Sequence, residues 1–67
     1  MPNDYCTLQV NRIYRWGNEE FFVKVLTEPE LDCDPESRFY KEYTFLGRDI
    51  ITGVESYMTA HGAWREA

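Results

Sequence analysis

The pair Gly17-Asn18 constrains the fold more than any other feature of the sequence. It separates residues 5–16 (YCTLQVNRIYRW) from residues 19–26 (EEFFVKVL), and both runs are rich in the aromatic and β-branched residues typical of strands. Glycine at the first position of a two-residue loop favours a type II′ turn, whose twist matches that of paired strands. The sequence therefore predicts a β-hairpin at this place.

A two-residue loop also fixes which residues lie opposite each other in the predicted hairpin. Side chains alternate between the two faces of a strand, so the register divides the hairpin into two faces. We expect the core face to pair Trp16 with Glu19, Tyr14 with Phe21, Arg12 with Val23, and Val10 with Val25. The opposite face then pairs Arg15 with Glu20, Ile13 with Phe22, Asn11 with Lys24, and Gln9 with Leu26.

Two further elements follow the hairpin. Residues 38–46 (RFYKEYTFL) alternate as a third strand does, with Phe39 and Phe45 on one side. From Arg48 the apolar spacing changes to three- and four-residue steps, which predicts a helix that ends near Gly62. Its stripe is formed by Ile50, Ile51, Val54, Tyr57, Met58, His61 and Trp64.

The start of this helix has two candidates. Asp49 can cap it directly, whereas Thr52-Gly53-Val54-Glu55 fits the capping box of a later start. Gly53 would cost about 1 kcal/mol inside a helix, which favours the later start.

Together the elements predict an α+β fold, a three-stranded antiparallel meander with one C-terminal helix packed on one face (βββα). The 67 residues form one small domain, near the lower limit for a single core. Aromatic residues make up 16% of the chain, so large rings can fill the few core positions. The predicted core consists of Val10, Tyr14, Phe21, Val23, Val25, Phe39, Phe45, Ile51, Val54, Tyr57 and Met58.

An acidic stretch, TEPELDCDPES, lies between the second and third predicted strands. Pro29 and Pro35 remove two backbone donors, so an irregular loop is expected. Its five carboxylates belong to Glu28, Glu30, Asp32, Asp34 and Glu36, and they are open to three interpretations: a solvated loop, a patch for a basic partner, or a cation site.

An EF-hand form of the cation interpretation fails on spacing. Asp32, Asp34 and Glu36 alternate as the first ligands of an EF-hand loop do. Such a loop needs glycine at its sixth position and glutamate at its twelfth, where this chain has Ser37 and Tyr43.

Other chemistry finds little support. Cys6, Cys33 and His61 are not in the closely spaced pairs that structural zinc sites use, so neither a metal nor another cofactor is expected. His61, the only histidine, falls on the apolar helical stripe, and no G-x-S-x-G or P-loop motif accompanies it, so an enzyme is not expected.

The sequence also carries expectations about location. MPNDYCTLQV has neither the basic nor the apolar region of a secretory signal. No apolar run approaches the roughly 20 residues of a membrane span. A cytoplasmic location without a Cys6–Cys33 disulfide follows.

The net charge of −5 disfavours attraction to nucleic acid or to anionic lipid and favours a basic protein surface. Our first hypothesis is a non-enzymatic interaction protein that binds and inhibits or modulates a basic, nucleic-acid-binding protein, its carboxylates replacing phosphates. An apolar strip on the second hairpin face adds a partner surface or a homodimer edge. The expected partner-binding residues are Glu28, Glu30, Asp32, Asp34, Glu36, Phe22, Tyr40 and Ile13.

In size, acidity and lack of catalytic motifs, the chain is similar to small phage-encoded inhibitors of host defence, including anti-CRISPR proteins. Those proteins share no common motif, so the resemblance carries over no residue. It implies action in the host cytoplasm if the chain is phage-encoded.

The alternative hypothesis is a nucleic-acid-binding module. A three-stranded sheet followed by a helix looks like the arrangement of AP2-type and integrase N-terminal DNA-binding domains, which bind DNA through the sheet. Five of the seven basic residues fall on the predicted strands: Arg12, Arg15, Lys24, Arg38 and Lys41. Glu19, Glu20 and Glu42 lie among them and offset their charge.

Overall fold

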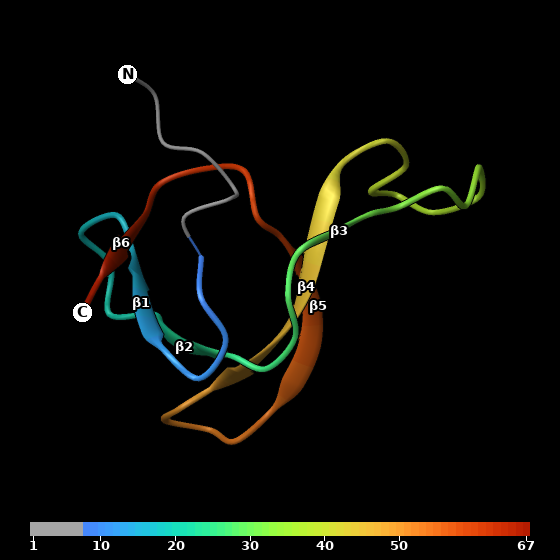
Figure 1. Cartoon of the computed structure of the whole chain (residues 1–67). Helices are drawn as coiled ribbons and strands as arrows, with labels where there is room; N and C mark the ends of the chain where they lie inside the picture. The colour runs from blue at the N-terminus through green and yellow to red at the C-terminus, as the bar shows by residue number, and fades with distance from the viewer. Residues whose placement is uncertain (1–7) are drawn as a thin grey trace.

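A computed structural model describes residues 8–67, which form a single antiparallel sheet of six strands (Figure 1). No described residue is helical, so the predicted α+β fold with a C-terminal helix is wrong and the described chain is all-β. Residues 8–67 accordingly offer no helix of the length and apolarity needed to cross a membrane. The strands are β1 (Ile13–Trp16), β2 (Phe22–Val25), β3 (Glu30–Leu31), β4 (Tyr43–Asp49), β5 (Glu55–Thr59) and β6 (Trp64–Glu66).

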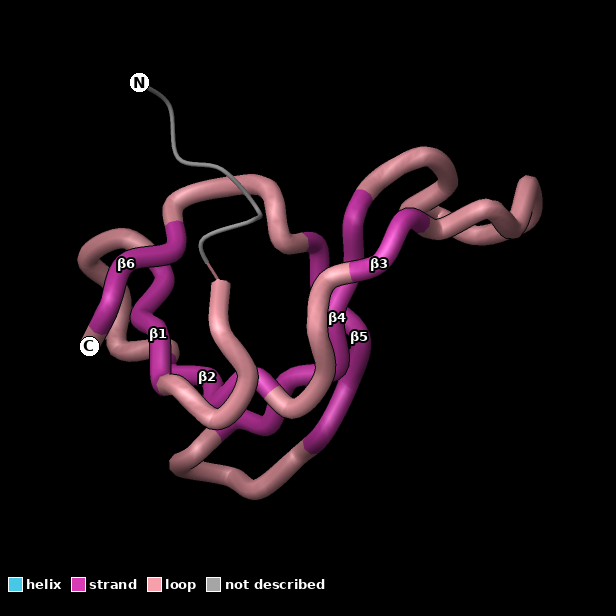
Figure 2. The backbone as a smooth tube through the Cα atoms, in the orientation of Figure 1, coloured by secondary structure: helices cyan, strands magenta, loops and turns pink. Residues whose placement is uncertain are grey.

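The strand β4 organises the sheet. One of its edges pairs with β3 near its start and with β2 near its end, while its other edge pairs with β5. From β2 the sheet continues through β1 to β6. The sheet curls, so that β4 and β5 lie on one side of the molecule and β1 and β6 on the other (Figure 2).

The predicted β1–β2 hairpin is confirmed, but its register is shifted by two residues. The turn lies at Gly17-Asn18, where Gly17 has φ +55° and the Glu19 N–H donates to the Trp16 carbonyl (3.0 Å). Pairing resumes only at Phe21, so Tyr14 lies opposite Val23 and not Phe21. A shift of two residues keeps every side chain on its face, and Tyr14 and Val23 are buried as predicted.

A bulge ends the pairing of β1 with β2. Asn11, with φ 72°, donates to the Val25 carbonyl, while the Val25 N–H donates to the carbonyl of Arg12, so two residues face one. Val10 was predicted to lie opposite Val25 in the core, but it is 37% exposed. Leu8 is buried instead, and the Gln9 N–H donates to the Tyr14 hydroxyl (2.9 Å).

The core is centred on Trp64 of β6. Its ring centroid lies 4.8 Å from that of Trp16, 5.7 Å from that of Phe45 and 6.1 Å from that of Phe21. Its indole N–H donates to the carbonyl of Thr59 (3.0 Å). The strand pairing therefore places the C-terminal tryptophan against aromatic residues of β1, of β4 and of the segment just before β2. The buried residues are Leu8, Tyr14, Val23, Val25, Phe45, Ala60 and Trp64.

A hairpin of β4 and β5 replaces the predicted helix. The Asp49 carboxylate accepts from the N–H groups of Ile51 (2.8 Å) and Thr52 (3.2 Å), so it caps a turn rather than a helix. Gly53 has φ +79°, the left-handed conformation that glycine adopts without strain. The predicted helical stripe is solvent-exposed at Ile50, Ile51 (69%), Val54 (61%), Tyr57 (65%) and His61.

The predicted third strand begins later than expected. Residues 38–42 form turns that include Lys41 at φ 68°, and β4 starts only at Tyr43. Phe45 is buried as predicted, whereas Phe39 is half-buried outside the core.

Candidate functional site

The acidic segment forms a hairpin that projects from the curled sheet (Figure 1). We call residues 28–42 the acidic hairpin. Backbone pairing extends past β3, because the Asp32 N–H donates to the Glu42 carbonyl (2.8 Å) and the Lys41 N–H to the Asp32 carbonyl (2.8 Å). The expected irregular loop is therefore confined to the tip, between Cys33 and Tyr40.

Thr27 joins this hairpin to the sheet. The Leu26 N–H donates to the Leu46 carbonyl (2.8 Å), and the Leu46 N–H then donates to the Thr27 hydroxyl (2.9 Å) in place of a backbone carbonyl. Pro29 has no backbone N–H, so it leaves no donor without a hydrogen bond in the segment between β2 and β3. The interruption in strand pairing leaves no unpaired donor at this point of β4, because the Thr27 hydroxyl accepts from the Leu46 N–H.

The tip is ordered by the Asp32 carboxylate. Its oxygens accept from the Asp34 N–H (2.9 Å) and from the Ser37 hydroxyl (2.6 Å), and Ser37 in turn accepts from the Phe39 N–H (3.1 Å). The hydrogen bond from Ser37, with that from the Asp34 backbone, lowers the pKa of Asp32. Asp34 repeats the motif by accepting from the Glu36 N–H (3.0 Å). The carboxylates of Asp32 and Asp34 are thus held in fixed directions.

Among the described residues, no carboxylate of the acidic hairpin forms an ion pair, although Arg38 and Lys41 belong to the same hairpin. Within residues 8–67 the ion pairs join Arg12 to Glu66 (3.0 Å) and Arg48 to Glu55 (2.6 Å), and both lie outside the hairpin. In the same residues, no three His, Cys, Asp or Glu side chains are grouped closely enough to hold a metal ion. The hairpin therefore presents a concentrated negative charge to solvent.

Beside these charges lies a hollow of about 430 Å³. Leu31 and Tyr57, both exposed, belong to its wall, and Glu30 and Asp34 supply acidic groups. A lysine or arginine side chain suits such a hollow, because its stem packs on apolar groups while its cation reaches carboxylates. The full lining is Glu30, Leu31, Asp32, Cys33, Asp34, Ser37, Phe39, Thr44 and Tyr57.

The apolar residues that were expected to bind a partner lie in two different parts of the structure. Tyr40 is exposed within the acidic hairpin, but Ile13 and Phe22 lie on β1 and β2. Phe22 is half-buried under Arg15, whose guanidinium carbon lies 5.6 Å from the ring centroid. The predicted apolar strip of the second hairpin face is therefore not one surface with Tyr40.

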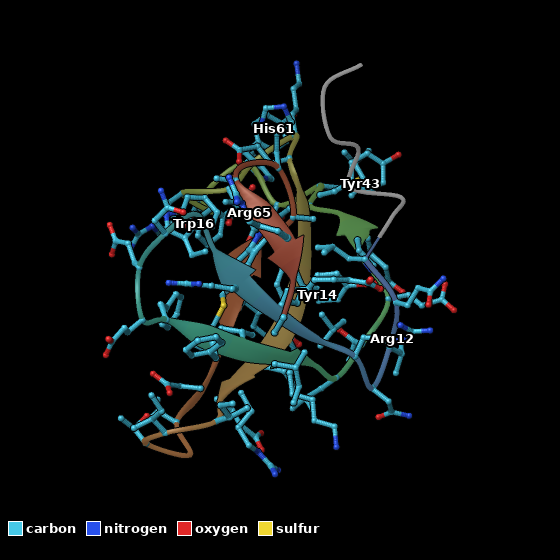
Figure 3. The ribbon with its side chains drawn as sticks, turned by 90° about the vertical axis from the view of Figure 1, so that its left-hand side faces the viewer. Arg12, Tyr14, Trp16, Tyr43, His61 and Arg65 are labelled. Carbon is cyan, nitrogen blue, oxygen red and sulfur yellow. The ribbon has the colours of Figure 1, made fainter. Side chains whose placement is uncertain are left out.

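His61 and Cys33, which were considered as zinc ligands, lie in different parts of the molecule. His61 is exposed after β5 and shares a hollow of about 450 Å³ with Lys41, Glu42 and Tyr43. Figure 3 shows His61 and Tyr43 at the same end of the molecule. Cys33 is an exposed free thiol in the acidic hairpin, and Cys6 lies outside the described residues.

The sequence analysis named Arg15 and Lys24 among the basic strand residues but missed Arg65 and Arg48, with which they form a basic row. Arg15 and Arg65 lie opposite each other on β1 and β6, and Lys24 lies opposite Arg48 on β2 and β4. Figure 3 shows Arg65 beside the β1–β6 pair. Arg65 was missed because it follows the predicted helix, which was expected to end near Gly62, and only the pairing of β6 with β1 places it beside Arg15.

Comparison with known proteins adds no relative: no family model matches the chain, and no curated protein or solved structure matches it significantly. The candidate site is defined by the geometry of the acidic hairpin alone.

Proposed function

We propose that this protein is a non-enzymatic interaction protein whose acidic hairpin binds a basic surface of another protein and inhibits or modulates it. The observation that carries the proposal is the display of five carboxylates, from Glu28 to Glu36, on a hairpin whose tip is ordered by its own hydrogen bonds. A preformed surface loses little conformational entropy on binding. Its negative charge speeds the encounter with a positive partner.

The hollow beside Tyr57 supports a specific form of contact. Aromatic and aliphatic anchors carry most of the affinity at protein interfaces, while charges fix orientation and encounter rate. Leu31, Phe39 and Tyr57 supply the apolar wall, and Glu30 and Asp34 the charge. We infer that the partner inserts a lysine or arginine side chain here.

A nucleic-acid-binding protein is the partner class that we favour. Its basic groove receives phosphates, and carboxylates spaced along a small domain can occupy the same positions. The resemblance to small phage-encoded inhibitors of host defence supports the same assignment and a cytoplasmic site of action.

The test compares two charge reversals of equal size. Glu30→Lys with Glu36→Lys changes the acidic hairpin at two exposed side chains that make no hydrogen bond or ion pair described above. Glu19→Lys with Glu20→Lys makes the same change in net charge at the β1–β2 loop. Tagged wild-type protein would first identify the partner in lysate of the cells that produce it, and the purified pair would then be studied by association kinetics.

We expect the Glu30 and Glu36 variant to slow association and weaken binding, while the Glu19 and Glu20 variant stays close to wild type. Added salt should slow wild-type association in the same direction. Equal effects of the two variants would mean that binding depends on net charge alone, and would refute a specific role for the acidic hairpin.

The nucleic-acid alternative has one observation in its favour, the basic row. Arginines directly opposite each other repel, so Arg15 and Arg65 suit a surface that meets an anion. Against it stand the net charge of −5 and the pairing of Arg48 with Glu55. The resemblance to DNA-binding domains depended on a helix after the sheet, and residues 8–67 contain no helix.

A further inference from the structure

We propose that two copies of this protein associate through the open edges of their β5 strands, which pair antiparallel about a two-fold axis at Tyr57. This interface differs from the contact proposed for the acidic hairpin but shares one residue with it, because Tyr57 also lines the hollow beside that hairpin. Within residues 8–67, β5 pairs with β4 alone, so its second edge has no strand beside it.

Hydrogen bonding at both ends of β5 shows which backbone groups face that edge. The Asp49 N–H donates to the Val54 carbonyl (2.9 Å), and the Ala60 N–H donates to the Tyr43 carbonyl (2.8 Å). Backbone N–H and C=O groups alternate in direction along an antiparallel ladder, so those of Glu55, Tyr57 and Thr59 point away from β4. The Thr59 carbonyl, which accepts from the Trp64 indole, confirms this direction and keeps a second lone pair.

Within the described part of the chain, the β5 edge has little of the usual protection against strand pairing. Natural edge strands are commonly blocked by lysine, proline, a bulge or very short length. The two-residue β3 follows Pro29 and carries Glu30, and the three-residue β6 carries Arg65 and Glu66. By contrast, β5 is five residues long, and the charge of Glu55 is compensated by Arg48.

The sequence of β5 is complementary to itself in this arrangement. A two-fold axis at Tyr57 places the two Tyr57 residues opposite each other and Glu55 opposite Thr59 of the second copy, so that no like charges meet. Tyr57 is 65% exposed in the single chain, and an aromatic cross-strand pair would cover it.

The inner face of β5 also favours a second copy over an unrelated strand. In the same register, Met58 of the second copy lies opposite Ser56. Ser56 borders an apolar hollow of about 290 Å³, lined by Trp16, Phe21, Ser56, Met58, Thr59 and Trp64. A flexible methionine is suited to fill such a space between aromatic rings.

Sedimentation velocity over a range of protein concentrations tests the dimer. Tyr57→Lys places two lysines opposite each other at the axis, and we expect it to raise the dimer dissociation constant about tenfold or more, which corresponds to about 1.4 kcal/mol. Ile51→Lys is the matched control, because Ile51 is equally exposed on the same hairpin but lies outside β5. We expect that control to dimerise as the wild type does.

Cross-linking tests the two-fold axis itself. With Cys6 and Cys33 replaced by serine, Tyr57→Cys should form an intermolecular disulfide under mild oxidation, because paired residues of neighbouring strands lie within disulfide range. Ile51→Cys in the same background should form it much less. A wild-type protein that stays monomeric, or equal cross-linking at both positions, would overturn the proposal.

The charge reversals at Glu30 and Glu36 separate this proposal from the proposed function. The β5 dimer should persist in that variant. Loss of the dimer would show that copies meet through the acidic hairpin, and the β5 interface would be wrong.

Discussion

The side chain of Asp32 holds the tip of the acidic hairpin together. The hydroxyl of Ser37 and the N–H of Asp34 both stabilise its charged form, which lowers its pKa. We predict that Ser37→Ala returns the pKa of Asp32 toward its ordinary value and speeds amide exchange at Asp34 and Phe39. NMR titration and hydrogen exchange measure both effects. Ser56→Ala, which alters a serine remote from Asp32 in the sequence, should change neither quantity.

The pH dependence of the tip follows from the same carboxyl group. Its pKa is lower in the folded chain than in the unfolded chain, so the stabilisation is complete above the unfolded pKa. The stabilisation is lost as the pH falls through the folded pKa. We therefore predict that amide protection at Asp34 is constant near neutral pH and decreases only under acid conditions. A loss of protection near neutral pH would contradict the role of Asp32.

Gly47 allows three strands to pack closely. A Cβ atom at this position would lie 2.5 Å from Val23 Cγ1, 3.0 Å from the Phe45 ring and 3.3 Å from the Met58 sulfur. We predict that Gly47→Ala lowers the free energy of unfolding by about 1–3 kcal/mol, because the buried neighbours must shift. Thermal unfolding measures the change, and Ser56→Ala on the adjacent strand is the control. A variant as stable as wild type would mean that the core is looser than described.

At the scale of elements, proline substitution distinguishes the β5 strand from the predicted helix. The N–H of Met58 faces β4, whereas the N–H of Tyr57 faces the open edge. We predict that Met58→Pro unfolds the protein, because proline removes a ladder hydrogen bond between β4 and β5, while Tyr57→Pro is tolerated at the open edge. Circular dichroism and thermal unfolding report both outcomes. A helix would be disrupted by either substitution.

The β1–β2 hairpin was predictable because its signal is local. Gly17 and Asn18 specify a turn, and the strand period of two then fixes which side chains are buried, even with the register shifted by two. Trp64 was placed on the predicted helical stripe, but its position at the centre of the core was not predictable, because it depends on pairing between β6 and β1, which are far apart in the sequence.

The region from Ile50 to Tyr57 misled the sequence analysis for a physical reason. Three- and four-residue spacing predicts a helix only if the apolar residues are buried, and here Ile51, Val54 and Tyr57 are exposed. Gly53, flanked by a turn cap at Asp49, was the local signal for a hairpin. Local composition therefore indicated the turn, but only the sheet shows which side of it faces solvent.

For the whole molecule, the charge distribution matters more than the net charge. The acidic hairpin lies on the β4 side, and the row from Arg65 to Arg48 crosses the sheet. We predict weak or no binding of duplex DNA at physiological salt, because Glu55 offsets Arg48 and the net charge opposes phosphate. Fluorescence anisotropy measures this. Tight binding that is lost in Arg15→Gln with Arg65→Gln would favour the nucleic-acid alternative.

The candidate site was partly predictable at this scale. The acidic residues follow one another in the sequence, so their concentration is a property of composition. The hollow could not be predicted in this way. Tyr57 and Leu31 lie near each other only because β5 and β3 both pair with β4. A sequence analysis that assigns Tyr57 to a helix cannot place it beside the acidic residues.

The hydroxyl of Thr27 satisfies the Leu46 N–H where the chain passes from β2 to β3, so the tip of the acidic hairpin can change without the loss of that hydrogen bond. Its length and composition can vary while Leu46 keeps its hydrogen bond and the rest of the fold persists. A related chain could thus acquire a new partner by replacing only residues 33–40, much as an antibody domain changes its loops on a constant framework. The same property makes this position suitable for grafting a foreign recognition loop.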